Sequence, residues 1–505
     1  MKFNIFPKNA QVVENYEGAK AYRLTPEMEL YAAVVTAGLS DTFYEKEDTR
    51  LARIQALMLN ADAEFIAKLA IYARTEMHLR SIPMVLAVEL ARMSSGQTVV
   101  SQAVKGVVKR ADEITELLAY YQLANKRTGT KKLNKLSKQV QKGLSEAFNR
   151  FDEYQFAKYD RATEVTLRDA LFLVHPKAKD EAQQLLFNKI AKKELAVPYT
   201  WETELSALGQ VKYADETKKA NVLKWKWEEL IDSGKLGYMA LLRNLRNILQ
   251  AEVSAAHVRK VCAYLSDEQA VLNSKQLPFR FLAAYREIKV LPSEYVTMIL
   301  NALEDAVVVS VQNMKGFDAS TRVTIACDVS GSMQKAISPK SKVMLYDIGL
   351  MLGMLMQSKC ERVVSGMFGD SWKVINLPNR GVLGNVEEYY KREGEVGYST
   401  NGYKVIKDLI SRRVVMDKVM LFTDCQLWNS QGTGDNMQRS WLAYKKIAPD
   451  AKLYLFDLAG YGNTPLRVEQ HDTYLIAGWS DKVFDVLQAI ENGEDALTKI
   501  KQVML

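Results

Sequence analysis

The chain has 505 residues, too many for one ordinary hydrophobic core, so its length predicts two to four domains. A composition of 48% hydrophobic and 25% charged residues is typical of soluble globular proteins, and no run approaches the roughly 18 apolar residues of a membrane helix. Four cysteines without CxxC spacing argue against disulfides and zinc, and the first residues lack a signal-peptide pattern. We therefore expect a cytoplasmic protein. A net charge of +8 is too mild to indicate a nucleic-acid partner alone.

The first part of the chain, from about Leu24 to Val309, has an almost wholly helical pattern. Apolar residues recur at three- and four-residue spacing, as at Leu51, Ile54 and Leu57. Short helices that follow one another without an exact repeat favour an α-solenoid of the HEAT kind, in which each helix pair buries its face on the next. A single large helical bundle is the alternative. We expect this domain to span residues 1–312.

Positive charge is concentrated in one segment of this helical part. On a helix over residues 131–144, four lysines fall on one stripe and three leucines and a valine lie opposite. A solvated lysine face is the alternative, but solvated helices usually interleave glutamate with lysine, and aligned like charges favour a polyanion such as RNA. The candidate RNA-binding residues of this segment, which contains no acid, are Lys126, Arg127, Lys131, Lys132, Lys135, Lys138 and Lys142.

A helix is predicted directly after this segment, over residues 166–174. Thr166 and Asp169 have the spacing of an N-cap pair, and Pro176 ends the helix. His175 lies in the last turn, where the helix dipole favours a cation. From these residues alone, His175 has the role of a capping histidine.

Strand and helix patterns alternate after a polar linker at residues 312–320. The predicted strands are 322–328, 362–368, 372–377, 418–424, 452–457 and 472–477, with helices between them and a closing helix over residues 490–505. This order predicts a doubly wound, mostly parallel sheet in a second domain spanning residues 321–505.

Oxygen donors follow two of these strands at their carboxyl ends, where open α/β folds bind ligands. The donors are Asp328, Ser330, Ser332, Thr400 and Asp424. Carboxylate and hydroxyl oxygens suit a hard divalent cation, Mg²⁺ first, with Mn²⁺ and Ca²⁺ as alternatives. The set resembles, residue for residue, the metal-ion-dependent adhesion site of von Willebrand factor A domains. In the alternative interpretation, the serines cap the next helix and Asp424 is a turn residue.

A helical solenoid followed by such a domain resembles the Ro ribonucleoprotein, or TROVE-domain, family. The resemblance extends over nearly the whole chain. It is carried, besides the metal motif, by the segments 15–19, 79–86, 158–176, 238–247 and 277–280. It implies a HEAT-like ring beside an α/β, Rossmann-like von Willebrand factor A domain. It also implies binding of Y-like small noncoding RNA on the outer ring surface and of single-stranded ends of misfolded RNA in the central hole.

The resemblance also implies roles for individual residues and partners. Lys158 and His175 match the lysine and histidine of the family's Y RNA site, whereas the arginine position holds Ala162, with Arg161 one residue earlier. A 3′→5′ exoribonuclease is the implied protein partner. Three further arginines have two interpretations, RNA contact in the hole or pairing with acids of neighbouring helices: Arg80, Arg243 and Arg246.

Two functions of different classes follow from these patterns. The first is a noncatalytic, monomeric RNA-binding scaffold for noncoding-RNA quality control, without a membrane partner. The second is a metal-dependent protein-interaction module on a helical-repeat scaffold, in which one coordination position takes a partner's carboxylate. A metal-dependent hydrolase is a weak third hypothesis, because the sequence shows neither second-metal acids nor a Ser/His/Asp order.

Overall fold

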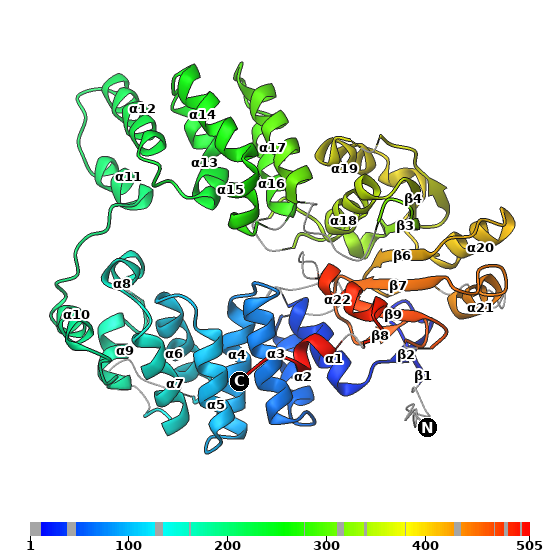
Figure 1. The fold of residues 1–505 in the computed structure, drawn as a ribbon, viewed down its shortest axis with the longest axis horizontal. Helices are drawn as coiled ribbons and strands as arrows, with labels where there is room; N and C mark the ends of the chain where they lie inside the picture. Colours follow the sequence, from blue (N-terminus) through cyan, green and yellow to red (C-terminus); the bar gives the residue numbers. More distant parts are fainter. Residues whose placement is uncertain are drawn as a thin grey trace. The chain divides into compact units, whose positions relative to one another are not determined.

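A computed structural model describes residues 12–37, 47–126, 135–160, 163–276, 278–310, 318–337, 341–378, 380–428, 436–468, 470–478, 483–494 and 497–505 (Figure 1). The chain divides into two compact units. One comprises Met1–Ala52 and Trp227–Leu497, and the other Arg53–Lys226 and Thr498–Leu505. None of the described helices is long and apolar enough to cross a membrane.

The second unit contains successive helices that pack in two layers. Its helices follow α2 (Glu47–Met58) as α3 (Ala63–Thr75), α4 (Ser81–Met93), α5 (Thr98–Val107), α6 (Asp112–Ala124), α7 (Lys138–Phe148), α8 (Glu153–Tyr159), α9 (Leu167–Val174), α10 (Glu181–Lys192), α11 (Trp201–Gly209) and α12 (Glu216–Asp232). α3 packs on α5 and α5 on α7, while α4 packs on α6 and α6 on α9. Contact between every second helix is the arrangement of a helical solenoid.

Two helix predictions in this unit are wrong. The apolar pattern of the sequence continues from Ala103 to Leu123 and predicts a single helix, but the structure breaks it between α5 and α6. The reason is Glu113, a buried carboxylate whose Oε2 accepts hydrogen bonds from the backbone amides of Lys109 (2.7 Å) and Arg110 (3.0 Å). The helix predicted over residues 131–144 begins, among the residues that the structure describes, at Lys138, because Ser137 caps it by accepting a hydrogen bond from the Val140 amide.

The first unit continues the helical part with α13 (Tyr238–Gln250), α14 (Ala255–Ser266), α15 (Glu268–Ser274), α16 (Pro278–Lys289) and α17 (Val296–Ser310). α13 packs on α16, and α14 on α17. α16 and α17 also contact the helices of the α/β domain, so the last helices of the solenoid-like part and the sheet domain share one unit.

The sheet of the α/β domain has the strand order β5 (Trp372–Val374), β4 (Arg362–Phe368), β3 (Arg322–Asp328), β6 (Lys418–Thr423), β7 (Lys452–Asp457) and β9 (Thr473–Ala477). Only β5 runs antiparallel to its neighbour. The chain leaves β3 for β4 on one side and returns to β6 on the other, so the strand order reverses at β3. Ligands of open α/β sheets bind at this point, beyond the carboxyl ends of the strands. The predicted doubly wound sheet is confirmed.

The helices of this domain are α18 (Leu345–Lys359), α19 (Val382–Lys391), α20 (Tyr403–Ser411), α21 (Met437–Tyr444) and α22 (Val483–Glu491). α18 packs on β3 and β6, and α22 on β9. The predicted closing helix over residues 490–505 is wrong. α22 ends before Gly493, whose φ of +83° leaves the helical region, and the one helix that follows among the described residues is α23 (Thr498–Lys501), packed on α3.

A short hairpin near the amino end joins the α/β domain, although the sequence predicts no strand there. β1 (Val12–Glu14) pairs antiparallel with β2 (Lys20–Arg23), and β2 pairs with β8 (Asn463–Thr464). Asn15 shapes the turn between β1 and β2, because its Oδ1 accepts hydrogen bonds from the amides of Glu17 (3.1 Å) and Ala19 (2.8 Å). α1 (Pro26–Val35) then packs against β9.

Candidate metal centre and RNA interface

Three of the predicted metal ligands lie in the loop that follows β3. The side chains of Asp328, Ser330 and Ser332 are buried. The Ser330 amide donates to Asp328 Oδ1 (2.9 Å), which folds the loop back on the strand end, and the hydroxyls of the two serines lie 3.3 Å apart. Thr423, at the end of the adjacent strand β6, donates to Asp328 Oδ2 (2.6 Å). Both serine oxygens are thereby gathered beside a fixed carboxylate.

The other two predicted ligands, Thr400 and Asp424, are buried in neighbouring loops that are linked to each other. The Thr400 hydroxyl donates to the carbonyl oxygen of Gln426 (2.9 Å) and accepts from the amide of Trp428 (2.7 Å). The Asp424 Oδ1 accepts from the Gln426 amide (3.0 Å). The structure therefore brings all five predicted donors to one edge of the sheet.

The loop that carries Thr400 is held in place by Asp370, which follows β4. Asp370 Oδ1 accepts a hydrogen bond from the Ser399 amide (3.0 Å). Gly397 approaches the same carboxylate so closely that a Cβ at this position would overlap it, and its φ of +74° also requires glycine. The hydrogen bonds from Ser399 lower the pKa of Asp370, so the carboxylate that positions Thr400 is favoured in its ionised form.

The electrostatics of the site test whether a cation fits. Burial raises the pKa of both Asp328 and Asp424, and the negative charge of Asp328 raises that of Asp424 further. The Oδ2 atom of Asp424 is buried and accepts no hydrogen bond from the described residues. Two buried carboxylates and an unsatisfied oxygen fit a dication, which would offset the repulsion and fill the missing contact. Hydroxyl and carboxylate oxygens are ligands that Mg²⁺ prefers.

Two carboxylates near this centre were not predicted from the sequence. Asp457, buried at the end of β7, accepts hydrogen bonds from the amides of Ala459 (3.0 Å) and Gly460 (2.7 Å), and its charge contributes to the raised pKa of Asp424. The same signal, an apolar strand that ends in an acid, could have identified it. Glu17, whose charge contributes to the raised pKa of Asp328, is too far away in sequence for any local signal to connect it.

The turn that carries Glu17 is attached to the metal loops by two hydrogen bonds. The Asn15 amide group donates to the carbonyl oxygen of Leu427 (2.9 Å), and the Tyr16 amide donates to Gln426 Oε1 (2.9 Å). Because the backbone of Gln426 also holds Asp424, the amino-terminal turn and the metal loops form one connected network.

Two lysines of the predicted basic segment, Lys138 and Lys142, lie on α7, which packs against α9. Gln141 of α7 donates to the carbonyl oxygen of Val174 (2.9 Å), and Asn149 contacts the chain after α9 at Lys177 and Lys179. Five exposed basic residues lie along α7 and at the chain that follows α9, and we call them the basic cluster: Lys138, Lys142, His175, Lys177 and Lys179. Within the described residues no ion pair holds any of the four lysines. Lys177 and Lys179 were not predicted, because they lie outside the helical stripe.

His175 is the C-cap of α9 in the left-handed conformation (φ 47°), and its amide donates to the Leu171 carbonyl. The predicted capping box of Thr166 and Asp169 is also present. Lys158 lies half-buried near the end of α8, with its ammonium group 5.9 and 5.7 Å from the ring centres of Tyr154 and Tyr159. α9 has eight residues, so at a rise of about 1.5 Å per residue it is roughly 12 Å long, and His175 lies at its carboxyl end.

The remaining residues of the predicted basic segment have different positions. Lys126 is exposed just after α6, and Lys135 is exposed ahead of α7 rather than on its lysine stripe, which is a correction to the helical placement. Four predicted RNA-binding residues, together with Ala162 at the position of the family's arginine, lie outside the described residues: Arg127, Lys131, Lys132 and Arg161.

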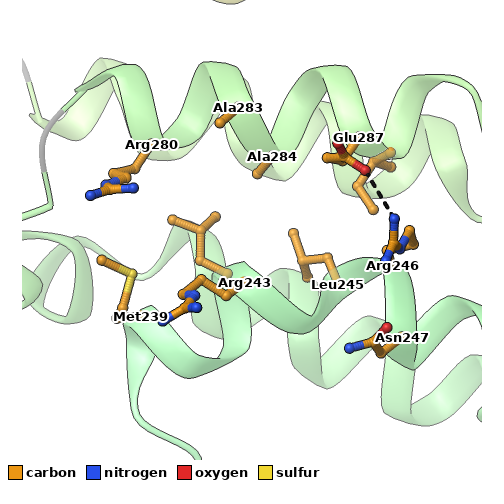
Figure 2. A pocket seen from close by; sticks show the side chains of 11 residues that line it. Met239, Arg243, Leu245, Arg246, Asn247, Arg280, Ala283, Ala284 and Glu287 are labelled. Atoms are coloured by element: carbon orange, nitrogen blue, oxygen red, sulfur yellow. Dashed lines mark hydrogen bonds and ion pairs between the residues drawn. The ribbon is translucent and has the colours of Figure 1, made fainter. Parts of the chain in front are cut away.

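A pocket of about 320 Å³ lies between α13 and α16 and contains three arginines (Figure 2). At one end Arg246 pairs with Glu287 (3.4 Å). At the other end Arg243 and Arg280 extend from facing helices, and in the described part of the chain neither has an acidic partner. The pKa of Arg280 is lowered, first by desolvation and then by the charge of Arg243. Two unneutralised guanidinium groups in one pocket form a binding site for an anionic group.

Arg80 has a different environment. It pairs with Asp112 (2.6 Å), Glu113 (3.8 Å) and Glu116, which all belong to α6, the neighbouring helix of the same layer as α4. These pairs support the structural interpretation of Arg80, in which its charge is balanced within the solenoid.

Comparison with known proteins identifies the family. The family model of the TROVE domain matches residues 37–218 and 191–296, more than half of the 505 residues. The chain belongs to the TROVE family. Its fold is similar to the crystal structure of Deinococcus radiodurans RO (RSR) protein, with a TM-score of 0.61 and 18% identity over 93% of this chain and 100% of that chain.

The chain is also similar to telomerase protein component 1. It is 26% identical to the Mus musculus protein over 315 residues and to the Rattus norvegicus protein over 304 residues, which are 47% and 44% of this chain. These matches cover only 12% and 11% of the two much longer relatives. The basic cluster and the arginine pocket lie within the TROVE match, whereas the candidate metal centre lies outside it.

Proposed function

We propose that this TROVE protein is a noncatalytic RNA-binding scaffold for noncoding-RNA quality control. The observation that carries the proposal is the basic cluster. Four exposed lysines, which have no acidic partner among the described residues, lie near a histidine at a helix end. Their like charges repel one another unless a polyanion binds over them. A double-stranded, Y-like small RNA suits this surface, because A-form RNA is recognised through its phosphates and its shape.

The arginine pocket supports a second RNA contact, to a single strand. Arg243 and Arg280 would hold a phosphate group, and the apolar wall of the pocket, which includes Leu242, leaves room for an unstacked base. In a closed helical ring this pocket would receive the single-stranded end of a misfolded RNA, while a duplex would be excluded by its width. Cleavage of that RNA would belong to a partner 3′→5′ exoribonuclease. The protein would act in the cytoplasm, as a monomer.

The candidate metal centre has a supporting role in this proposal. Asp328, Ser330, Ser332, Thr400 and Asp424 would hold Mg²⁺ and fix the loops at the edge of the sheet. The orphaned oxygen of Asp424 also supports an alternative function, a metal-dependent protein-interaction module without RNA.

The test is filter binding of a structured small RNA over a salt series. We expect binding at 50 mM salt, and a salt-dependence slope that falls by about one for each phosphate contact removed. The double variant Lys138→Glu/Lys142→Glu should bind more weakly and with a smaller slope. The matched control is Lys212→Glu/Lys218→Glu, which reverses two exposed lysines elsewhere in the same unit. No binding at 50 mM salt, or an equal loss in the control, would refute the proposal.

The pocket is tested separately with an RNA that carries a single-stranded 3′ tail. Arg243→Ala/Arg280→Ala should reduce the preference for tailed over blunt RNA about tenfold or more, since each lost bidentate phosphate contact contributes about 1–3 kcal/mol. Arg246→Ala is the control, because the charge of Arg246 is already paired with Glu287. An unchanged preference in the double variant would exclude the pocket from RNA binding.

A further inference from the structure

One end of the arginine pocket carries more positive charge than an internal phosphate of RNA can balance. Arg243 of α13 and Arg280 of α16 reach this end from facing helices (Figure 2). Neither forms an ion pair with any residue that the structure describes, so two positive charges remain there. An internal phosphodiester carries one negative charge, whereas a phosphomonoester at the end of a strand carries about −1.5 to −2 at neutral pH. The charge of the two arginines therefore matches a terminal phosphate.

The opposite end of the pocket is bridged by an ion pair between the two helices. Arg246 of α13 lies 3.4 Å from Glu287 of α16, as the dashed line in Figure 2 shows. Glu287 is also held by Lys342, whose ammonium group lies 2.6 Å from its second oxygen. A strand that ran through the pocket would have to displace these pairs, whereas a strand that ends inside the pocket would leave them intact. The bridge therefore favours a strand end over an internal segment.

Between its two ends the pocket is apolar and has room for one nucleotide. Its volume of about 320 Å³ is near the lower limit of ligand pockets, roughly 300 Å³, which suits a single nucleotide and not a run of several. Ala283 and Ala284 line the α16 side, and their small side chains leave the space open opposite Leu242 and Leu245 of α13. A base can lie against this wall while its phosphate contacts the arginines.

We propose that the arginine pocket binds the phosphorylated end of a single-stranded RNA, with the terminal phosphomonoester between Arg243 and Arg280 and the last base against the apolar wall. This inference rests on the RNA contact proposed for the pocket. It narrows the ligand from any single strand to a strand end that carries a phosphate. The pocket would then distinguish RNA fragments with a terminal phosphate from RNAs of the same sequence that end in a hydroxyl.

Filter binding of the full chain to hairpin RNAs with single-stranded tails tests the inference. The tails have one sequence, lie at the 3′ or the 5′ end, and finish in a phosphate or a hydroxyl. For the wild-type chain we expect the phosphate to raise the affinity about tenfold or more at one end at least, the effect of one further hydrogen bond to a charged group. A gain at only one end identifies the end that the pocket accepts, and no gain at either end refutes the inference.

Two double variants locate the contact. Arg243→Ala/Arg280→Ala should lose the gain from the phosphate, and the fold should tolerate it because both side chains are exposed. The matched control is Arg259→Ala/Arg439→Ala, which removes two exposed arginines from other helices of the same unit and should keep the gain. A gain that persists in the first variant, or that is lost equally in the control, places the phosphate elsewhere and refutes the inference.

The same measurements separate this inference from the proposed function. If the wild-type chain does not prefer tailed over blunt RNA, the RNA contact of the pocket and this inference both fail. If it prefers tails but binds phosphate and hydroxyl ends equally, the RNA contact stands and the inference is refuted. A free nucleoside monophosphate that binds as tightly as the phosphate-ended tail would assign the pocket to nucleotides in place of RNA ends, which also refutes it.

Discussion

Replacement of Arg286 by methionine should strongly destabilise the junction between α16 and the α/β domain. Arg286 lies in α16 with 14% of its side chain exposed, and its two terminal nitrogens donate to the oxygens of Asp347 at 2.6 and 2.7 Å. Its Nε donates to Glu387 (2.6 Å). Asp347, at the start of α18, is fully buried. Arg286→Met would leave that carboxylate without its counterion, and removal of one partner of a buried ion pair costs about 3–5 kcal/mol.

Urea unfolding followed by tryptophan fluorescence measures this loss, and a surface ion pair of the same domain provides the control. Arg322 pairs with Asp417 (2.5 Å), but 37% and 40% of these side chains are exposed. Arg322→Met should therefore cost about 1 kcal/mol or less. If Arg286→Met lowers the free energy of unfolding by no more than Arg322→Met does, burial is not what makes the Arg286 pairs important, and the reasoning is wrong.

Three further predictions concern packing, pH and metal. Gly143→Ala should destabilise the solenoid by about 1–3 kcal/mol in thermal unfolding, because its Cβ would lie 2.7 Å from a backbone oxygen of α5, whereas Gly209→Ala has nothing within 4 Å and should be neutral or stabilising. The hydrogen bonds from Arg322 lower the pKa of Asp417 in the folded chain. They therefore stabilise the folded chain fully above the unfolded pKa of about 4, and this stabilisation is lost as the pH falls through the lowered folded-state pKa. Asp417→Asn should flatten the decrease in stability below pH 5. Mg²⁺ at 100 times its Kd should stabilise the wild-type chain by about 2.7 kcal/mol in calorimetry, and Ser332→Ala should abolish this increment.

The central strands of the sheet could be predicted well because β3, β6 and β7 are buried on both faces. β3, β4 and β7 begin and end where the sequence predicts, since their apolar runs stop at a polar residue or a turn. The two acids of the predicted metal set, Asp328 and Asp424, could be singled out for the same reason, because each directly follows an apolar run. A third acid, Asp457, ends the apolar run of β7 in the same way and is also buried.

Features that depend on distant partners could not be predicted. The hairpin strand β2 pairs with only two residues of β8, and neither segment has an alternating pattern long enough to indicate a strand. The break between α5 and α6 depends on one buried carboxylate, Glu113, within an otherwise helical pattern. The basic cluster depends on the packing of α7 against the end of α9, which brings Lys177 beside Asn149, at the end of the helix that carries Lys138 and Lys142.

These distant contacts mean that neither predicted domain contains all the residues that hold its own loops and strands in place. A chain cut before residue 321 would leave the metal loops without the turn at residues 15–19 and β8 without its partner β2. The same cut would separate Arg286 from Asp347 and expose a buried carboxylate at the start of α18. Conversely, the predicted helical domain would lose α23, which packs on α3 and whose Lys501 carbonyl oxygen accepts a hydrogen bond from Lys68 of α3 (2.9 Å). The metal centre and the helical part are therefore properties of the whole chain, which is the form in which RNA and cation binding have to be measured.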